Sequence, residues 1–344
     1  MTIILFILIL GAIIFVHELG HFLFAKMFNV YVHEFALGMG PKLWSKKGKE
    51  TVYSLRAIPI GGFCQLAGEN DEEEDKDIPK DRLLQAKKPW KRFLIMACGA
   101  IFNFLLAIVL LFIITLITGS NDTRPLIQNV EDNLPAYREG VEAGDRVISI
   151  NDNRVTTIYD ISLFLTIADR EKPVVMVIER DGQRKTIEMQ AEKVEVDGEE
   201  VYRFGIGLEA EQQTGFVNAV RYTFIRTGSM FRQMWFTIAS LFTGDISVSQ
   251  LSGPVGIYSL VGEQSQGGIM SILFLTAFLS INVGFINLLP LPAFDGGRIV
   301  FLIIEKVKGS PVKAKTENII HTIGLILLML LMIYITFQDI LRLF

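Results

Sequence analysis

Cysteine and histidine are scarce in this chain, which has two cysteines and four histidines among its 344 residues. Cys64 and Cys98 are not spaced as a disulfide framework, which excludes the class of small secreted domains held by disulfides. Basic residues are not in excess either, because the formal net charge is −4 and no basic stripe carries interleaved aromatic residues. We therefore expect no nucleic-acid partner.

Hydrophobic residues are abundant instead and make up 50% of the chain. Four segments are long enough to cross a bilayer, whose hydrocarbon core requires ~20 residues of helix. They are residues 2–28, 93–118, 270–291 and 319–337. The first segment lacks the basic start and the A-x-A site of a cleaved signal peptide, so we expect it to stay in the mature protein. The sequence predicts a polytopic α-helical membrane protein with about four transmembrane helices.

Basic residues gather beside two of the connections between these segments. Four directly precede the second segment and five lie in the short third connection: Lys87, Lys88, Lys91 and Arg92, then Arg298, Lys306, Lys308, Lys313 and Lys315. Cytoplasmic loops of membrane proteins carry an excess of Lys and Arg. We therefore expect both connections to lie on the cytoplasmic side and both termini to lie outside.

Two stretches between the apolar segments indicate folded β-structure. Short strands at 31–35, 42–44, 51–56 and 63–66 predict a small membrane-associated β-region, in which the acidic run 70–77 indicates a solvated loop. Strands at 126–130, 146–150, 174–180 and 185–189, with a helix at 158–168, predict one inserted α+β domain. The helical stretch 216–242 that follows carries Arg221, Arg226 and Arg232, which favour a helix lying in the membrane interface over one that spans it.

These patterns divide the chain into six parts. They are a first transmembrane helix (1–28), a β-region on the cytoplasmic side (29–92), a second transmembrane helix (93–118), the α+β domain (119–213), an amphipathic segment (214–262), and the third and fourth transmembrane helices (263–344).

The first apolar segment contains the pattern H-E-x-x-H at residues 17–21. Positions four apart share one face of a helix, so His17 and His21 can reach one metal ion while Glu18 lies beside it to move a proton. Ionisable groups within a bilayer are costly and indicate functional sites. The pattern predicts one Zn²⁺ per chain, with the two histidines as ligands and Glu18 as the general base.

A catalytic zinc ion usually has three protein ligands, so a third ligand is required. We predict Asp295, because it follows the third span in N-L-L-P-L-P-A-F-D-G-G, where two prolines interrupt the helix and two glycines permit a tight turn. In the predicted topology the first and third spans both run inward, which brings Asp295 and His17 to the inner half of the membrane. Four rival residues are interpreted instead as polar residues of the β-region or as a packing residue of the fourth span: Glu34, Glu50 and His33, and His321.

H-E-x-x-H in the first span and N-x-x-P-x-P-x-x-D-G at the end of the third together resemble the site-2 protease family of intramembrane zinc metalloproteases. Residues 134–151 resemble the core of a PDZ domain, a module that binds an extended peptide as an added strand. One inserted domain of this kind is similar to the bacterial RseP/RasP-type members. The PDZ-like domain could also be a folded spacer that has no ligand.

The resemblance implies a role for each matching residue. His17, His21 and Asp295 would bind zinc, Glu18 would be the general base, and Asn287 would hold the substrate or its transition state. Further substrate contacts are implied for two prolines beside Asn287 and for glycines that follow the first span: Pro290 and Pro292, and Gly38, Gly40, Gly61 and Gly62. The chain departs from the family at Phe294, where leucine is usual, and the two side chains have similar volumes.

The resemblance also implies a function and a location. The protein would cut single-pass transmembrane proteins, such as anti-sigma factors or signal-peptide remnants, after an earlier protease has shortened them. It would be a multi-pass protein of a bacterial plasma membrane, with the PDZ-like domain and both termini outside and the active site toward the cytoplasm. A membrane metal transporter and a catalytically idle adaptor remain as alternatives, although the transporter does not require Glu18 and the adaptor does not require an intact ligand set.

Overall fold

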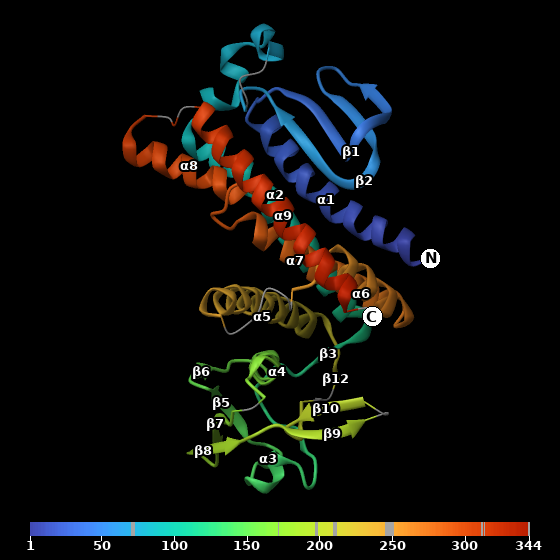
Figure 1. Cartoon of the computed structure of the whole chain (residues 1–344), viewed down its shortest axis with the longest axis vertical. Coiled ribbons are helices and arrows are strands. Elements are labelled where there is room, and N and C mark those ends of the chain that lie inside the picture. Colours follow the sequence, from blue (N-terminus) through green and yellow to red (C-terminus); the bar gives the residue numbers. More distant parts are fainter. Residues whose placement is uncertain are drawn as a thin grey trace. The chain divides into compact units, whose positions relative to one another are not determined.

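The computed structural model describes residues 1–69, 73–170, 172–196, 199–208, 212–244, 251–310, 312 and 314–342. The chain forms two compact units (Figure 1). One unit comprises Met1–Leu111 and Val248–Phe344, and the other comprises Phe112–Ser247. The candidate metal ligands all belong to the first unit, so the fold of that unit determines their geometry.

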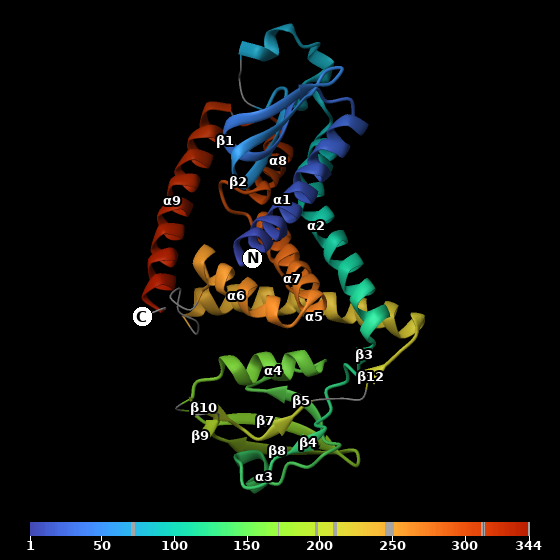
Figure 2. The same cartoon turned by 90° about the vertical axis from the view of Figure 1, so that its right-hand side faces the viewer.

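Four helices in the described part of the chain are long and apolar enough to cross a membrane. They are α1 (Thr2–Met27), α2 (Pro89–Thr118), α7 (Ile269–Asn287) and α9 (Ala314–Leu341) (Figure 2). The prediction of about four apolar spans is therefore confirmed. The third span ends at Asn287, before the predicted end at Leu291, because the proline-containing loop begins there.

Local sequence explains where α1 ends. Asn29 adopts the left-handed conformation, with φ 56°, and the Val30 N–H donates to the Ala25 carbonyl at 2.8 Å. Asparagine tolerates this conformation better than most residues, and the bond back to Ala25 closes the last turn as in a Schellman motif. The chain then turns directly into the β-region beside the H-E-x-x-H residues.

Two further helices complete the first unit and were not predicted as helices. They are α6 (Pro254–Gln266) and α8 (Asp295–Lys308). Pro254 is the first residue of α6, where its missing N–H costs nothing. Asp339 near the end of α9 is 4% exposed and accepts hydrogen bonds from the N–H groups of Gly253 and Gly256 at 2.9 and 2.8 Å. A carboxylate at this position satisfies the free donors at the start of α6 and complements the helix dipole.

The β-region consists of two long, sharply bent strands, β1 (Val32–Lys47) and β2 (Val52–Leu66). The bends occur at glycines with positive φ: Gly38 at 85°, Gly40 at 82° and Gly61 at 88°. Bending lets residues 34–37 pair both with 62–65 and with 52–55, while residues 42–47 pair with 52–56. The four predicted short strands are therefore present, as halves of two continuous strands.

The acidic run after β2 is more ordered than expected. Residues 70–72 lie outside the described residues, and three short 3₁₀ helices follow: η1 (Glu73–Asp77), η2 (Lys80–Arg82) and η3 (Leu84–Ala86). Asp75 is bonded to His33 Nε2 at 2.8 Å and accepts the Gly68 N–H at 2.9 Å. The prediction of a solvated loop is wrong for Asp75, which fixes this segment to the sheet, and the assignment of His33 as a polar sheet residue is confirmed.

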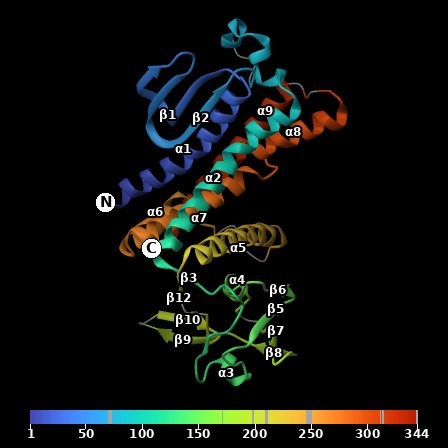
Figure 3. The same cartoon turned by 180° about the vertical axis from the view of Figure 1, so that it is seen from behind.

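The second unit contains a four-stranded sheet in the order β6-β5-β7-β8, with α4 along it (Figure 3). Its elements are β5 (Arg146–Ile150), β6 (Asn153–Arg154), α4 (Ile158–Ile167), β7 (Val174–Arg180) and β8 (Gln183–Met189). Ile150, Ile161 and Met176 are fully buried in its core, so the apolar face of α4 packs on the sheet. The predicted strands 146–150, 174–180 and 185–189 and the predicted helix agree closely with these elements, whereas only residues 129–130 of the predicted strand 126–130 form a strand.

Short elements surround this sheet. They are β3 (Ser120–Asn121), β4 (Asn129–Val130), α3 (Pro135–Arg138), β9 (Glu192–Val196), β10 (Glu199–Arg203), β11 (Ile206–Gly207) and β12 (Gln212–Gln213). β3 pairs with β12 and β4 pairs with β11, so the chain enters and leaves the domain through adjacent strands.

The amphipathic stretch forms one helix, α5 (Phe216–Thr243), which is not among the candidate spans of the described residues. Two of its three arginines contact α4 within the second unit. The Arg226 guanidinium lies 3.7 Å from the centre of the Tyr159 ring, and Arg232 lies 3.3 Å from Asp160. These arginines therefore attach α5 to the domain, and its location in the membrane interface remains a prediction.

Candidate metal centre

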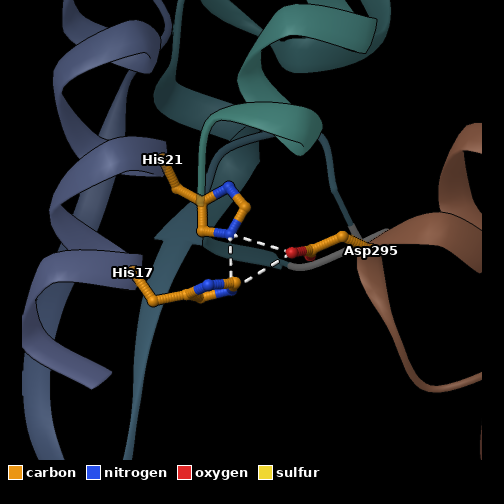
Figure 4. A group of neighbouring side chains, drawn as sticks. All are labelled: His17, His21 and Asp295. Atoms are coloured by element: carbon orange, nitrogen blue, oxygen red, sulfur yellow. Dashed lines mark hydrogen bonds and ion pairs between the residues drawn. The ribbon is translucent and has the colours of Figure 1, made fainter. Parts of the chain in front are cut away.

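The three predicted ligands converge on one point, although Asp295 is more than 270 residues away from the histidines in the sequence (Figure 4). His17 Nε2 lies 3.1 Å and His21 Nε2 lies 3.3 Å from Asp295 Oδ2. The two Nε2 atoms are 3.2 Å apart. Ligand atoms placed about 2.0–2.1 Å from a tetrahedral zinc ion are about 3.3 Å apart, so this spacing matches a zinc site.

The other ring nitrogens determine what the site presents. His21 Nδ1 donates to the Ile95 carbonyl at 2.8 Å. In the neutral ring Nε2 then carries no proton, and its lone pair is available to a metal. His17 Nδ1 lies 3.3 Å from the Asn103 amide nitrogen, while Asn103 Oδ1 is buried and has no hydrogen-bond partner among the described residues. Exchanging the amide oxygen and nitrogen gives Oδ1 a proton to accept from His17 Nδ1. Both Nε2 atoms then face Asp295 without a proton.

A cation between the three ligand atoms would stabilise this arrangement. Two nitrogen lone pairs and a carboxylate oxygen repel one another unless positive charge lies between them. Asp295 Oδ2 is buried and receives no hydrogen bond within the described part of the chain, as expected if neither nitrogen has a proton to donate. The donor set of two imidazoles and one carboxylate therefore fits a catalytic zinc ion, with a fourth position left for water.

Glycines allow α1 and α2 to approach closely at the site. A Cβ on Gly20 would overlap the Cys98 carbonyl, and a Cβ on Gly99 would overlap His21 Nε2 and lie 2.8 Å from His17 Cε1. These two small residues let the imidazoles pack directly against the α2 backbone.

The loop that carries Asp295 differs from the prediction in one respect. Gly296 and Gly297 were expected to form a tight turn, but both lie in the first turn of α8. Their missing side chains leave room for the Leu289 and Leu291 carbonyls, which a Cβ would overlap. The tight turn instead occurs at Ala293, with φ 75°.

Glu18 lies against the second strand of the β-region. The Cys64 backbone N–H donates to its carboxylate, and a Cβ on Gly62 would lie 3.3 Å from Glu18 Cγ. The predicted substrate residue Gly62 is therefore beside the predicted base. Gly38, Gly40 and Gly61 form the bends of the strands, and a Cβ on Gly38 would lie 2.6 Å from the Ile58 carbonyl.

The remaining predicted substrate residues are not among the metal-facing groups. Asn287 Nδ2 donates to the Val283 carbonyl at 3.0 Å, one turn back in α7. Pro292 packs against Gly324 of α9, while Pro290 is exposed. The substrate-binding roles of these residues remain predictions.

The rival ligands have other partners. Glu34 accepts hydrogen bonds from Ser54 and Arg56 inside the β-region. Hydrogen bonds from Arg82 and Lys26 lower the pKa of Glu50 to about 2. His321 Nδ1 accepts the Ala293 N–H at 3.0 Å, which confirms its interpretation as a hydrogen-bonded packing residue.

Sequence reasoning missed the contribution of α2. Ile95, Gly99 and Asn103 orient or accommodate the two imidazoles, and Ser280 of α7 donates to the Asn103 carbonyl at 2.8 Å. The available signal was Asn103 itself, a fully buried amide in an otherwise apolar span.

A comparison with protein families finds one match that covers nearly the whole chain. The model of peptidase family M50 matches residues 5–331. The chain belongs to peptidase family M50. Zinc metalloprotease RasP of Bacillus licheniformis and the regulator of sigma-W protease RasP of Bacillus subtilis are each 32% identical, over all of this chain and 99% of the relative. A putative zinc metalloprotease of Clostridium perfringens is 35% identical, over 99% of this chain and 98% of the relative.

Membership in M50 confirms several predictions. The resemblance to the site-2 protease family, the peptidase activity and the zinc cofactor agree with the family and with the names of these relatives. A metal transporter receives no support, because a peptidase family matches almost the entire chain. The four apolar helices are consistent with a multi-pass bacterial membrane protein.

Proposed function

We propose that this M50 peptidase cleaves transmembrane segments of membrane proteins, with zinc held by His17, His21 and Asp295 and with Glu18 as the general base. The convergence of three ligand atoms within 3.1–3.3 Å of one another carries this proposal. A relative named as a regulator of sigma-W protease supports substrates that control transcription from the membrane, such as anti-sigma factors.

Zinc, when bound, supplies a Lewis acid that makes water acidic and polarises the peptide carbonyl. Glu18 follows His17 directly, and the Cys64 N–H orients its carboxylate. This carboxylate takes the proton from the attacking water and passes it to the nitrogen of the leaving amine. Asn287 would hold the substrate carbonyl, as the family resemblance implies.

Replacing Asp295 with Ala should remove the metal. Two histidines alone provide only two of the three protein ligands of a catalytic zinc site, so we expect the variant to lose both bound zinc and cleavage of a membrane peptide. Metal content per chain, measured on protein purified in detergent, tests this expectation. Asp181→Asn, at an exposed turn of the second unit, is the control that should keep one zinc ion. Full zinc content in the Asp295 variant would disprove this ligand set.

The β-region provides an edge where a substrate can pair. A transmembrane helix must unwind before its amides can be attacked, and strand pairing would replace the hydrogen bonds that it loses. The Cys64 N–H points at Glu18, and backbone groups two residues apart in a strand face the same side. The polar groups of Gly62 therefore face the same side as Glu18. Exposed apolar residues make the region suitable for a membrane: Met39, Leu43, Trp44, Leu55 and Ile58.

Comparing Gly62→Pro with Gly62→Ala tests the pairing. Both variants add the same Cβ, but only proline removes the backbone N–H. We expect the proline variant to cleave about tenfold more slowly than the alanine variant, which corresponds to one lost hydrogen bond. Initial rates on one transmembrane peptide provide the measurement. Equal rates would show that the substrate does not pair at this position.

The inserted domain has a groove suited to a peptide, which supports its assignment as PDZ-like. Ligand pockets typically have volumes of about 300–1,000 Å³. This groove, between α4 and residues 204–208, measures 420 Å³. Leu165 and Thr166 of α4 line one side, and Phe204, Ile206 and Leu208 line the other. We place this domain and both termini outside the cell, with the metal site toward the cytoplasm, because the basic residues flank the opposite connections.

Deleting residues 126–208 should allow substrates with intact ectodomains to be cut. The ends of the deletion can be joined, because the strands just outside it are adjacent: Asn121 of β3 pairs with Gln212 of β12. Cleavage of long and pre-shortened forms of one substrate should differ in the wild type and become similar in the deletion variant. Thr166→Arg, at an exposed position of α4 that lines the groove, blocks the groove without disturbing the core, and it separates peptide binding from exclusion by size. Selectivity that survives the deletion would place the gate elsewhere.

A further inference from the structure

The loop that leads to Asp295 is held by α9, a helix that contributes none of the three proposed metal ligands. Ala293, two residues before Asp295, donates its N–H to His321 Nδ1 of α9 at 3.0 Å. Ala293 is in the left-handed conformation, with φ 75°, which is unfavourable for a residue with a Cβ. Such a conformation persists only where its surroundings fix it, and His321 provides a bond that does so.

The same face of α9 accommodates the preceding residue. Gly324 lies one turn beyond His321, and positions three apart share a helix face. A Cβ on Gly324 would overlap the Pro292 side chain and lie 3.0 Å from its carbonyl carbon. α9 therefore contacts two consecutive residues of the loop. His321 accepts the Ala293 N–H, and Pro292 packs into the room that the missing side chain of Gly324 leaves.

The His321 ring is also fixed against the helix that begins at Asp295. Its centroid lies 5.6 Å from that of Phe301 in α8. Thus Phe301 sets the position of the ring on one side, and the ring holds Ala293 on the other. Asp295 lies between these two contacts in the sequence, at the first position of α8.

We propose that His321 is a positioning residue for the metal site: its Nδ1 holds the left-handed Ala293 and thereby fixes the place of Asp295. This inference rests on the proposed role of Asp295 as the third ligand. Removing a residue that forms a hydrogen bond to a metal ligand typically weakens metal binding by about 10–100-fold. His321 acts one step further out, because it bonds to the backbone of the loop and not to a proposed metal ligand.

Three variants separate the hydrogen bond from the bulk of the ring. In His321→Asn the amide oxygen can occupy the place of Nδ1, in His321→Gln it lies further out near the place of Nε2, and His321→Leu has no acceptor. Thr336→Val is the control, because Thr336 lies on the same helix and its hydroxyl donates along that helix to the Met332 carbonyl. The dissociation constant of zinc, measured by competition with a coloured chelator on the full-length protein, is the main measurement.

We expect His321→Gln and His321→Leu to weaken zinc binding by about 10–100-fold, and His321→Asn to stay within about threefold of the wild type. The Asn and Gln variants decide the question even if the leucine variant does not fold. Unchanged zinc affinity in the Gln variant, or an Asn variant as weak as the Gln variant, would overturn the proposal. If Asp295→Ala retains zinc, the proposed ligand set fails instead, so the two failures are distinguishable.

Discussion

Replacing Glu18 with Gln is expected to abolish peptide-bond cleavage while zinc remains bound. Glutamine has nearly the same shape and can still contact the Cys64 backbone, but it cannot take a proton from water. General-base catalysis typically contributes about 10²–10⁴-fold to the rate, so the cleavage rate should fall by at least about a hundredfold. His17, His21 and Asp295 are unchanged, and their three ligand atoms still lie within 3.1–3.3 Å of one another.

Cleavage of a transmembrane peptide and metal content are measured on the same preparation. Glu263→Gln, an exposed residue of α6, is the matched control and should behave as the wild type. Loss of zinc together with activity would indicate that Glu18 maintains the structure of the site. Normal cleavage by the Glu18 variant would rule out its role as the base.

Replacing Gly99 with Ala should disrupt the metal site as severely as losing a ligand. The added methyl group would overlap His21 Nε2 and lie 2.8 Å from His17 Cε1, so both imidazoles would have to move. Neither can move easily, because His21 is bonded to Ile95 and His17 contacts Asn103. We expect loss of most bound zinc and a fall in cleavage of at least about a hundredfold, since a ligand displaced by about 1 Å leaves the bonding range of zinc.

Gly11→Ala is the control for this prediction. Gly11 also lies in an apolar helix, but nothing is within 4 Å of the position that its Cβ would occupy. Alanine stabilises a helix by about 0.5–1 kcal/mol relative to glycine, so this variant should keep its zinc and its activity. Zinc retained at the wild-type level in Gly99→Ala would mean that α1 and α2 can separate without cost to the site.

The parts of the site that could be predicted are those that depend on regular local geometry. His17 and His21 share a face because α1 is helical through both, and helical periodicity is visible in the sequence. Asp295 could be predicted because topology limits where the end of the third span can lie. The strands of the inserted domain followed from alternating apolar residues and turn residues.

The parts that could not be predicted depend on contacts between distant segments. Ile95 and Asn103 orient the imidazoles from α2, and nothing in the H-E-x-x-H pattern specifies such partners. A tight turn was expected at the glycines that follow Asp295. It occurs instead at Ala293, before Asp295, because the bond to His321 compensates for the left-handed backbone. Here tertiary structure overrides local preference.

The two polar attachments of α9 have a consequence for how the first unit responds to its membrane. His321 holds the loop before α8, and Asp339 holds the start of α6. The two residues are 18 positions apart on one helix, which corresponds to about 27 Å at 1.5 Å per residue. Because α9 is a continuous helix, it keeps the start of α6 and the loop after α7 at a constant separation. A thinner or thicker bilayer should therefore change the inclination of the whole bundle, because α7 is not free to change its own tilt.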